Sequence, residues 1–260
     1  MPINVLVLRT AGTNCDAETV FAWQQAGARA DRIHINRLIE DPRRLDAYQV
    51  LTIPGGFSYG DDISAGKIFA NQVVHHLADA VTDFLARDRL VLGICNGFQV
   101  LVKAGLLPGG KDGRPTLEQA ATVTSNDRGL FDDRWVRLRV DTDRCVFLEK
   151  GEVLEMPIAH AEGKFVPAEG APVGALDAAG QVAVRYVGPD GETGAGWPWN
   201  PNGSVGDVAG LCDPTGRIFG LMPHPERHVL PWHHPQWTRR PPVAEGDGLA
   251  VFRRGVAYFA

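Results

Sequence analysis

The sequence predicts an α/β protein whose core is an open, mostly parallel β-sheet with helices on both faces. In the first hundred residues, short apolar runs alternate with segments whose apolar residues recur at helical spacing, and short glycine-rich turns join them. This alternation is typical of parallel strands connected by crossover helices. From about residue 120 to 220, strand-like pieces separated by Gly, Pro and Asp dominate. They indicate further strands on the same domain, some of them antiparallel.

Four strands are predicted in the first hundred residues, at 5–8, 32–36, 50–53 and 90–94. The first is fully apolar, as expected of a strand buried on both faces, and the second alternates only weakly. A helix is expected around Ala17 and Phe21, with Gly27 at its end. A second, long helix is expected between Phe69 and Phe84, where apolar residues recur at steps of three and four.

In the second half of the chain, the clearest strand-like pieces are residues 136–140, 182–187 and 218–222. A segment rich in Pro, Trp and charge starts at about residue 231 and is expected to be irregular, and residues 249–259 are expected to form a closing helix. No internal repeat and no clear linker divides the sequence. We therefore expect residues 1–260 to form a single domain with an irregular C-terminal extension.

Composition and charge exclude several classes of protein. The formal net charge of −5 gives no basic footprint for nucleic acid. No apolar run approaches the ~18 residues of a membrane-spanning helix, and the start of the chain lacks the features of a signal peptide. We therefore expect a cytoplasmic protein that binds neither nucleic acid nor membranes. The four cysteines include no Cys-x-x-Cys pair, so neither a zinc site nor a disulfide framework is indicated.

The predicted fourth strand runs directly into Gly93-Ile94-Cys95-Asn96-Gly97, after which helical spacing begins. A nucleophile between two glycines, with a strand before it and a helix after it, is a nucleophile elbow. The turn places the Cys95 thiol at a helix N-terminus, where the helix dipole favours the thiolate. The N–H of Asn96 can then donate to an oxyanion. The alternative is an inert, buried cysteine in an ordinary turn.

Two further turns follow predicted strands and carry groups that a reactive thiol needs. Gly55 and Gly56 follow the third strand, where flexible backbone can point its N–H groups at a ligand. His224 and Glu226 follow the strand at 218–222 and are two residues apart, so in an extended segment they project to the same face. They match the base and the orienting group of a catalytic thiol. Taken alone, a strand-ending turn and a solvated His–Glu pair are the plainer interpretations.

Two other motifs are rejected. Residues 60–67 resemble a phosphate-binding loop, but five residues instead of four separate the glycines, and Ile68 stands where Ser or Thr is needed. Four histidines lie between residues 224 and 234 near a glutamate, but their spacing is irregular. We therefore predict no metal and no cofactor in this chain.

Three segments together resemble one protein family. They are residues 54–61, Pro-Gly-Gly-Phe-Ser-Tyr-Gly-Asp; residues 93–99, Gly-Ile-Cys-Asn-Gly-Phe-Gln; and residues 222–227, Met-Pro-His-Pro-Glu-Arg. The family is the glutaminase subunit of phosphoribosylformylglycinamidine synthase, a class I glutamine amidotransferase of purine biosynthesis. Residues 12–16, 157–164 and 200–204 look like the same family, so the resemblance runs from about residue 3 to 230. It implies the flavodoxin-like sheet of class I glutamine amidotransferases.

The resemblance implies three sets of site residues. The catalytic set comprises Cys95 as the nucleophile, His224 as the base and Glu226 as its orienting partner. The oxyanion-hole set comprises Gly56, Phe57 and Asn96. The set expected to lie against bound glutamine comprises Gly55 and Gln99.

The resemblance also implies partners. The family joins a large synthetase subunit that converts formylglycinamide ribonucleotide to formylglycinamidine ribonucleotide, sometimes with a third small subunit. This chain carries no ATP signature, so ATP and magnesium are expected on the synthetase subunit. Two departures from the family pattern stand out. Residues 126–135 lack the expected Phe-Glu-Cys-Arg-Trp, and the tail beyond Pro231 looks more like the end of the fused, large form of the enzyme.

Two other functions remain open from the sequence. Another cysteine hydrolase on the same type of sheet would share the elbow, but not the His-Pro-Glu turn together with the Gly-Gly-Phe loop. A non-catalytic regulatory subunit would keep the fold without the activity. The intact Cys95, His224 and Glu226 argue against that second alternative.

Overall fold

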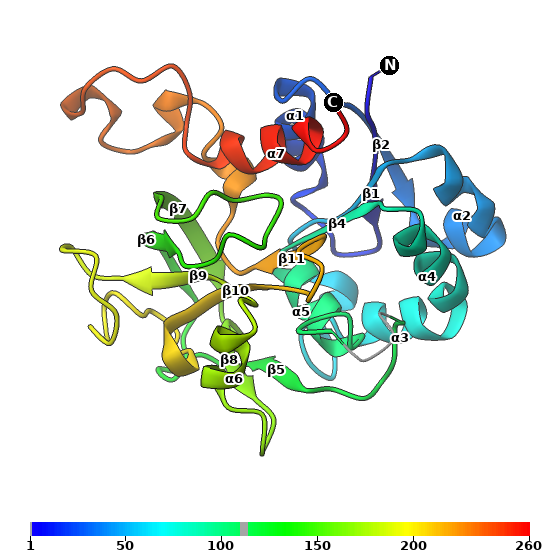
Figure 1. Cartoon of the computed structure of the whole chain (residues 1–260), viewed down its shortest axis with the longest axis horizontal. Helices are drawn as coiled ribbons and strands as arrows, with labels where there is room; N and C mark the ends of the chain where they lie inside the picture. Colours follow the sequence, from blue (N-terminus) through cyan, green and yellow to red (C-terminus); the bar gives the residue numbers. More distant parts are fainter. Residues whose placement is uncertain (1, 110–113) are drawn as a thin grey trace.

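The main sheet is open and mixed (Figure 1). The computed structural model describes residues 2–109 and 114–260. Within them, nine strands pair in the order β2-β1-β3-β4-β11-β10-β9-β6-β7. The first five in this order are parallel neighbours and the rest pair antiparallel, so that seven of the nine point the same way and β10 and β6 are reversed. The predicted open, mostly parallel sheet is confirmed.

The bounds of the elements follow the chain. The strands of the main sheet are β1 (Asn4–Arg9), β2 (Arg29–His34), β3 (Val50–Ile53), β4 (Leu90–Ile94), β6 (Asp132–Val140), β7 (Val153–His160), β9 (Val182–Val187), β10 (Val208–Cys212) and β11 (Ile218–Leu221). A separate two-stranded sheet consists of β5 (Ala121–Thr124) and β8 (Lys164–Pro167). The helices are α1 (Asp16–Gln25), α2 (Ile35–Glu40), α3 (Lys67–His76), α4 (Ala78–Ala86), α5 (Asn96–Lys103), α6 (Val173–Ala178) and α7 (Gly248–Ala257).

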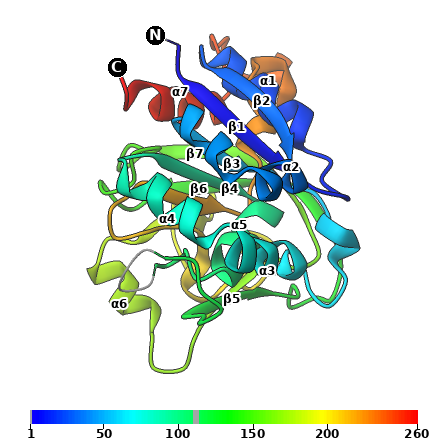
Figure 2. The ribbon, with the colours of Figure 1, turned by 90° about the vertical axis from the view of Figure 1, so that its right-hand side faces the viewer.

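Helices cover both faces of the parallel half, with α1 and α7 on one side and α3, α4 and α5 on the other (Figure 2). Strand β3 contacts both layers because successive side chains of a strand point to opposite faces. Thr52 accepts a hydrogen bond of 3.0 Å from the indole of Trp23 on α1. Ile53 faces α5, which approaches β3 at Gly97. Helix α7 joins the first layer through Phe252, whose ring meets that of Trp23 edge to face at 5.1 Å.

Two predicted elements differ from the structure. The single long helix expected between Phe69 and Phe84 is wrong, because the chain breaks at Leu77 (φ −123°, ψ 4°) into α3 and α4. The strand expected at 32–36 lies earlier, as β2, and helix α2 begins at Ile35. His34 ends the strand, because its ring nitrogen Nδ1 accepts a hydrogen bond from the N–H of Asn36 and so caps α2.

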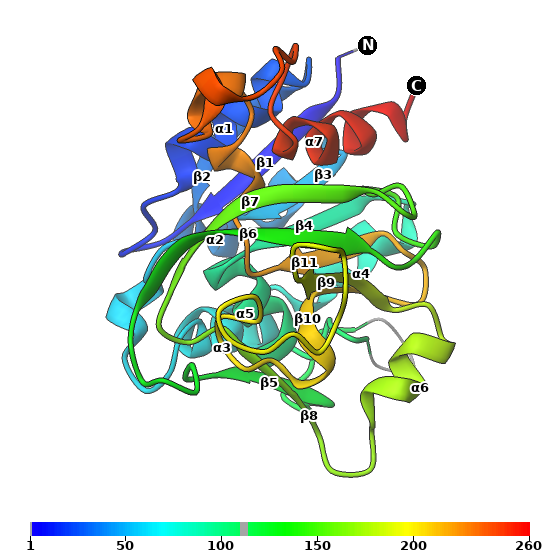
Figure 3. The same cartoon turned by 90° about the vertical axis from the view of Figure 1, so that its left-hand side faces the viewer.

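The second half of the chain completes the sheet and then leaves it. The antiparallel strands β6 and β7 pair over eight residues and form the far edge of the sheet (Figure 3). Beyond β11, residues 225–247 contain three short 3-10 turns and no strand: η4 (Pro225–Arg227), η5 (Pro231–His233) and η6 (Trp237–Arg239). None of the helices in the described parts of the chain is both long and apolar enough to cross a membrane.

The contact between the sheet and its first helix layer is testable. Thr52→Val keeps the volume of the side chain but leaves the buried indole N–H of Trp23 without an acceptor, so it should lower the free energy of unfolding by roughly 1–3 kcal/mol. Urea unfolding followed by tryptophan fluorescence measures the change. Thr124→Val, at an exposed position on β5, is the control. Equal stability of the two variants would contradict the proposed role of the Thr52–Trp23 hydrogen bond.

Candidate active site

Three turns meet at the carboxyl edge of the parallel half. Strands β3, β4 and β11 are parallel neighbours in the sheet, so the turns that follow them lie side by side. The turn after β3 carries Gly55, the turn after β4 carries Cys95, and the turn after β11 carries His224. Ligands of open α/β sheets bind at this edge. The structure therefore brings together the three segments that the sequence singled out.

Cys95 occupies a strained turn. Its backbone lies at φ 51° and ψ −106°, a conformation that costs a residue with a side chain about 1–3 kcal/mol. Close packing explains the flanking glycines. A Cβ on Gly97 would lie 1.9 Å from the carbonyl oxygen of Ile53, and a Cβ on Gly93 would lie 2.7 Å from the carbonyl oxygen of Gly97. The turn thus fixes the thiol at the start of α5, and the thiol is 5% exposed.

His224 and Glu226 form a buried pair. The ring nitrogen Nδ1 of His224 lies 2.6 Å from Oε1 of Glu226, and both residues are 1% exposed. Burial alone would lower the pKa of His224. The negative charge of Glu226 and the neighbouring thiols of Cys95 and Cys15 outweigh it and raise that pKa well above its ordinary value. The second ring nitrogen, Nε2, is buried without a well-placed hydrogen-bond partner in the described residues. The pair thus presents a basic imidazole with one nitrogen free for chemistry.

Gly55 lies where these groups meet. A Cβ there would be 2.8 Å from Cε1 of His224, 3.1 Å from the sulfur of Cys15 and 3.4 Å from Cβ of Cys95. Only a glycine fits between a thiol and its base at these distances. Gly55 was expected to lie against bound glutamine. In the structure, Gly55 lies between the side chains of Cys95 and His224.

Two of the three expected oxyanion donors are available. The N–H of Asn96 opens α5 and, as the first of the helix, has no partner within it. The N–H of Gly56 donates to no group in the described part of the chain. The N–H of Phe57, in contrast, already donates to the carbonyl of Gly12 at 3.0 Å. In this conformation the N–H of Phe57 holds the loop against the turn after β1, and its expected role in the oxyanion hole stays a prediction.

Both polar atoms of the Gln99 side chain form hydrogen bonds within the protein. Its Oε1 accepts a hydrogen bond of 3.0 Å from Nδ2 of Asn96, and its Nε2 donates to the carbonyl of Glu162. The residue is 3% exposed. In this conformation Gln99 braces the elbow, and its expected contact with glutamine stays a prediction.

The end of β7 forms a further wall of the site, which the sequence did not reveal. The carbonyl of Pro157 accepts a hydrogen bond of 2.8 Å from the N–H of His224, and the carbonyl of Ala159 lies 3.8 Å from the thiol of Cys95. His160 follows, with its Nδ1 at 3.2 Å from Oδ1 of Asn126. Burial, together with the charge of His224, lowers the pKa of His160 to about 3, so it stays neutral beside the catalytic base.

Cys15 is a second thiol at the site that the sequence analysis gave no role. Its sulfur accepts a hydrogen bond of 3.2 Å from Arg227. Burial raises the pKa of its thiol to about 11, so this sulfur stays protonated near neutral pH. Potential metal-ligating atoms of Cys15, His224 and Glu226 lie within 4.8 Å of one another, the one such group among the described residues. The absence of a metal in this chain stays a prediction.

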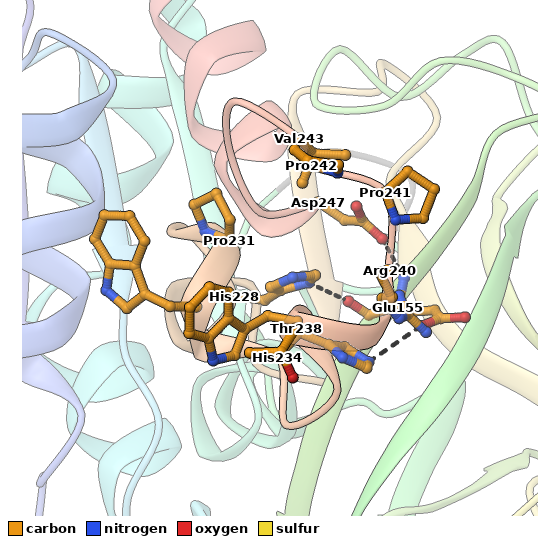
Figure 4. Close-up of a pocket in the computed structure, with 12 residues that line it drawn as sticks. Glu155, His228, Pro231, His234, Thr238, Arg240, Pro241, Pro242, Val243 and Asp247 are labelled. Carbon is orange, nitrogen blue, oxygen red and sulfur yellow. Dashed lines mark hydrogen bonds and ion pairs between the residues drawn. The ribbon is translucent and has the colours of Figure 1, made fainter.

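A separate cavity of about 720 Å³ lies under the tail (Figure 4). Its charged groups pair with one another around Glu155. The carbonyl of Glu155 contacts Nδ1 of His228 at 2.6 Å, and its carboxylate contacts Nε2 of His234 at 3.3 Å and also Arg240. The N–H of Glu155 donates to Asp247 at 2.8 Å. None of the three catalytic candidates lines this cavity.

Residues 230–245 form the tail loop, which lines this cavity, and backbone hydrogen bonds join the two ends of the loop. The N–H of Gly246 donates to the carbonyl of Val229 at 3.1 Å, and the N–H of Gly248 donates to the carbonyl of His228 at 2.9 Å. Helix α7 then begins at Gly248, where a Cβ would lie 2.0 Å from the carbonyl oxygen of Pro225. The turn that carries the base is therefore packed directly against α7.

Glu226→Gln tests the buried pair. Removing the negative charge should lower the pKa of His224, because that charge is the largest of the influences that raise it. The imidazolium that stabilises a neighbouring thiolate is then less populated, so alkylation of Cys95 by iodoacetamide near pH 7 should slow. The pKa is measured by NMR of the His224 ring. Glu149→Gln, at an exposed position, is the control, and an unchanged His224 pKa in Glu226→Gln would refute the argument.

Gly55→Ala tests the packing between thiol and base. The added methyl group would force His224 or the loop aside, and a displacement of about 1 Å in a catalytic group can cost ~100-fold in rate. The rate of Cys95 alkylation and its pH dependence report the loss. Gly174→Ala, on α6 where a Cβ meets nothing within 4 Å, should leave both unchanged. Wild-type behaviour of Gly55→Ala would show that the site has more room than its geometry indicates.

The comparisons with known proteins agree with this geometry. A chain from Dehalococcoides mccartyi, the phosphoribosylformylglycinamidine synthase subunit PurQ, is 43% identical, with 98% of this chain and 97% of that protein covered. A protein of the same name from Archaeoglobus fulgidus is 41% identical, with 98% and 97% covered.

Solved structures extend the comparison. A chain in the structure of PurLQS from Thermotoga maritima superposes with a TM-score of 0.74 at 30% identity, and both chains are covered completely. Another glutamine amidotransferase from that organism is 16% identical with a TM-score of 0.53, which shows the shared fold alone. A family model for the CobB/CobQ-like glutamine amidotransferase domain matches residues 2–259. The chain therefore belongs to the CobB/CobQ-like glutamine amidotransferase family.

Proposed function

We propose that this chain is the glutaminase component of a phosphoribosylformylglycinamidine synthase. It hydrolyses glutamine to glutamate and supplies the ammonia to an ATP-dependent synthetase subunit, which converts formylglycinamide ribonucleotide to formylglycinamidine ribonucleotide in purine biosynthesis. The observation that carries the proposal is the strained Cys95 thiol beside the buried His224–Glu226 pair. Near full-length similarity to proteins named for that synthase supports the choice of pathway.

The chemistry follows from the geometry. The Cys95 thiolate attacks the side-chain amide carbon of glutamine, and a carbon–sulfur bond forms as the carbonyl oxygen becomes an oxyanion. The N–H groups of Gly56 and Asn96 receive that charge; removing one such donor typically costs ~3 kcal/mol of barrier. The His224 imidazolium, held by Glu226, gives its proton to the departing nitrogen. The carbon–nitrogen bond breaks and ammonia leaves.

The same residues complete the turnover. A glutamyl thioester remains on Cys95. The now neutral His224 takes a proton from a water molecule, which attacks the carbonyl carbon of the thioester. The carbon–sulfur bond breaks, glutamate leaves, and the Cys95 thiolate is restored beside the His224 imidazolium. Because Nδ1 of His224 is held by Glu226, the proton moves through the free Nε2 in both halves of the reaction.

The partners form part of the proposal. Free ammonia would take up a proton at neutral pH and lose its nucleophilicity, so the ammonia has to pass within a complex to the large synthetase subunit. ATP and magnesium belong to that subunit, and a third small subunit is expected from the family resemblance. We place the complex in the cytoplasm, since all four cysteines are free thiols, as expected in a reducing compartment.

Glutamate release from glutamine tests the proposal, with and without the synthetase subunit, ATP and formylglycinamide ribonucleotide. We expect the partner and its substrates to increase the rate, and Cys95→Ala to abolish it in every mixture. Cys145→Ala, which removes a buried thiol away from the site, should retain the activity. Undiminished glutamate release by Cys95→Ala would exclude the mechanism. Retained binding to the synthetase with no glutaminase activity in the complex would support a non-catalytic subunit instead.

A further inference from the structure

The loop formed by η2 (Ser58–Asp61) and the residues that follow it, up to Gly66, has an unusual backbone. Three residues with side chains, Tyr59, Asp61 and Ile63, have φ values of 55°, 54° and 72°. Left-handed backbone costs each such residue about 1 kcal/mol or more, so surrounding contacts have to hold it. In sequence this stretch resembles a phosphate-binding loop but lacks its spacing. The structure shows instead that the loop is bound to the nucleophile elbow.

A closed ring of hydrogen bonds joins the loop to the elbow. The side-chain Nδ2 of Asn96 donates to Oδ1 of Asp61 at 3.0 Å and to Oε1 of Gln99 at 3.0 Å. Gln99 in turn donates to the carbonyl of Glu162. The carboxylate of Glu162 then accepts a hydrogen bond of 3.2 Å from the N–H of Ala65, which returns to the loop. Every side chain of the elbow in this ring is nearly inaccessible to water.

The ring also reaches the other oxyanion donor. Oδ1 of Asn96 accepts a hydrogen bond of 3.4 Å from the N–H of Ser58, two residues after Gly56. One side-chain amide therefore links the segment that carries Gly56 to the helix that carries the Asn96 N–H. Because Nδ2 is held on one side by the Asp61 carboxylate, its Oδ1 is directed towards Ser58.

We propose that Asp61 is a positioning residue: its carboxylate fixes the Asn96 side chain, and through it the spacing of the two backbone donors that receive the oxyanion. The inference rests on the proposed function for its substrate, but the positioning concerns any acyl transfer at Cys95. Donors of this kind act only when they already stand where the charge develops. A displaced Asn96 would weaken transition-state stabilisation more than glutamine binding.

The charged groups around Asp61 agree with this positioning role. Burial, together with the nearby charge of Glu162, raises the pKa of Asp61 to about 6. The N–H of Gly66, the Asn96 amide and the charge of Lys103 act in the opposite direction. Lys103 is itself buried and contacts the carbonyl of Ala65. Above the pKa the carboxylate accepts the Asn96 hydrogen bond as an anion. Below it, a protonated carboxyl is a weaker acceptor, so the ring should loosen as pH falls.

The test compares Asp61→Asn with Asp62→Asn, its exposed neighbour, by two assays. The first is glutaminase activity in the complex with the synthetase. The second is Cys95-dependent hydrolysis of p-nitrophenyl acetate by the chain alone, which uses the same oxyanion hole but no glutamine. Asp61→Asn should lower kcat in both by about tenfold, less than the ~100-fold cost of removing a donor outright. KM for glutamine should change by less than a factor of two, and Asp62→Asn should match wild type.

The pH profile separates positioning from a general structural role. Wild-type kcat should fall as pH drops through about 6, and Asp61→Asn should lose that limb while Asp62→Asn keeps it. An unchanged kcat in Asp61→Asn, or a loss confined to KM, would overturn the inference. Reduced ester hydrolysis in Asp61→Asn, with no glutaminase activity in wild type, would refute the proposed function and support the positioning role.

A measurement on the wild-type chain covers the case in which Asp61→Asn does not fold. The side-chain amide of Asn96, followed by NMR, should shift with a midpoint near pH 6, the same midpoint as the acid limb of kcat. An Asn96 amide signal that stays constant between pH 5 and 7 would show that Asp61 does not control it, and the inference would fall.

Discussion

The close approach of three turns around Gly55 is the constraint on which the rest of the site depends. The ring of His224, the sulfur of Cys15 and the Cβ of Cys95 all lie within van der Waals reach of a Cβ that this residue lacks. The approach is possible because β3, β4 and β11 are parallel neighbours that end at one edge. It also explains the burial of the site. Groups held this close leave no space for water, so each polar atom depends on a protein partner or on the substrate.

The pKa values of the histidines at the site follow from this exclusion of water. Burial opposes charge on His224, yet the Glu226 carboxylate beside it reverses the effect and favours the imidazolium. His160 is almost as deeply buried but has an amide for a partner, and its pKa is lowered. Two buried histidines thus have pKa values shifted in opposite directions because one faces a charge and the other faces a dipole. Their roles are set by their partners and not by their depth in the protein.

Much of this architecture could be predicted from the sequence, for identifiable reasons. The elbow, the Gly-Gly turn and the His-Pro-Glu turn each combine a strand end with residues of special conformation, and such local signals survive in a single sequence. The fourth strand was placed at its observed bounds. Contacts between distant segments carry no local signal. The hydrogen bond from Phe57 to Gly12 and the positions of Cys15 and His160 all depend on how separate segments meet. The apolar spacing continues across Leu77, so it gives no sign of the break between α3 and α4.

The closed base of the tail loop has a consequence for how this chain tolerates change. Hydrogen bonds from Gly246 and Gly248 back to residues 228–229 mean that the intervening stretch begins and ends at nearly the same place, while His234 within it packs against Trp135. The turn that carries His224 is packed against helix α7, outside this stretch. An insertion beside the exposed Val243 would therefore change the outline of the molecule and leave the catalytic histidine in place. The exposed tip of the stretch is thus a position where this chain can accept an added segment, or be joined to a second protein, while its chemistry is preserved.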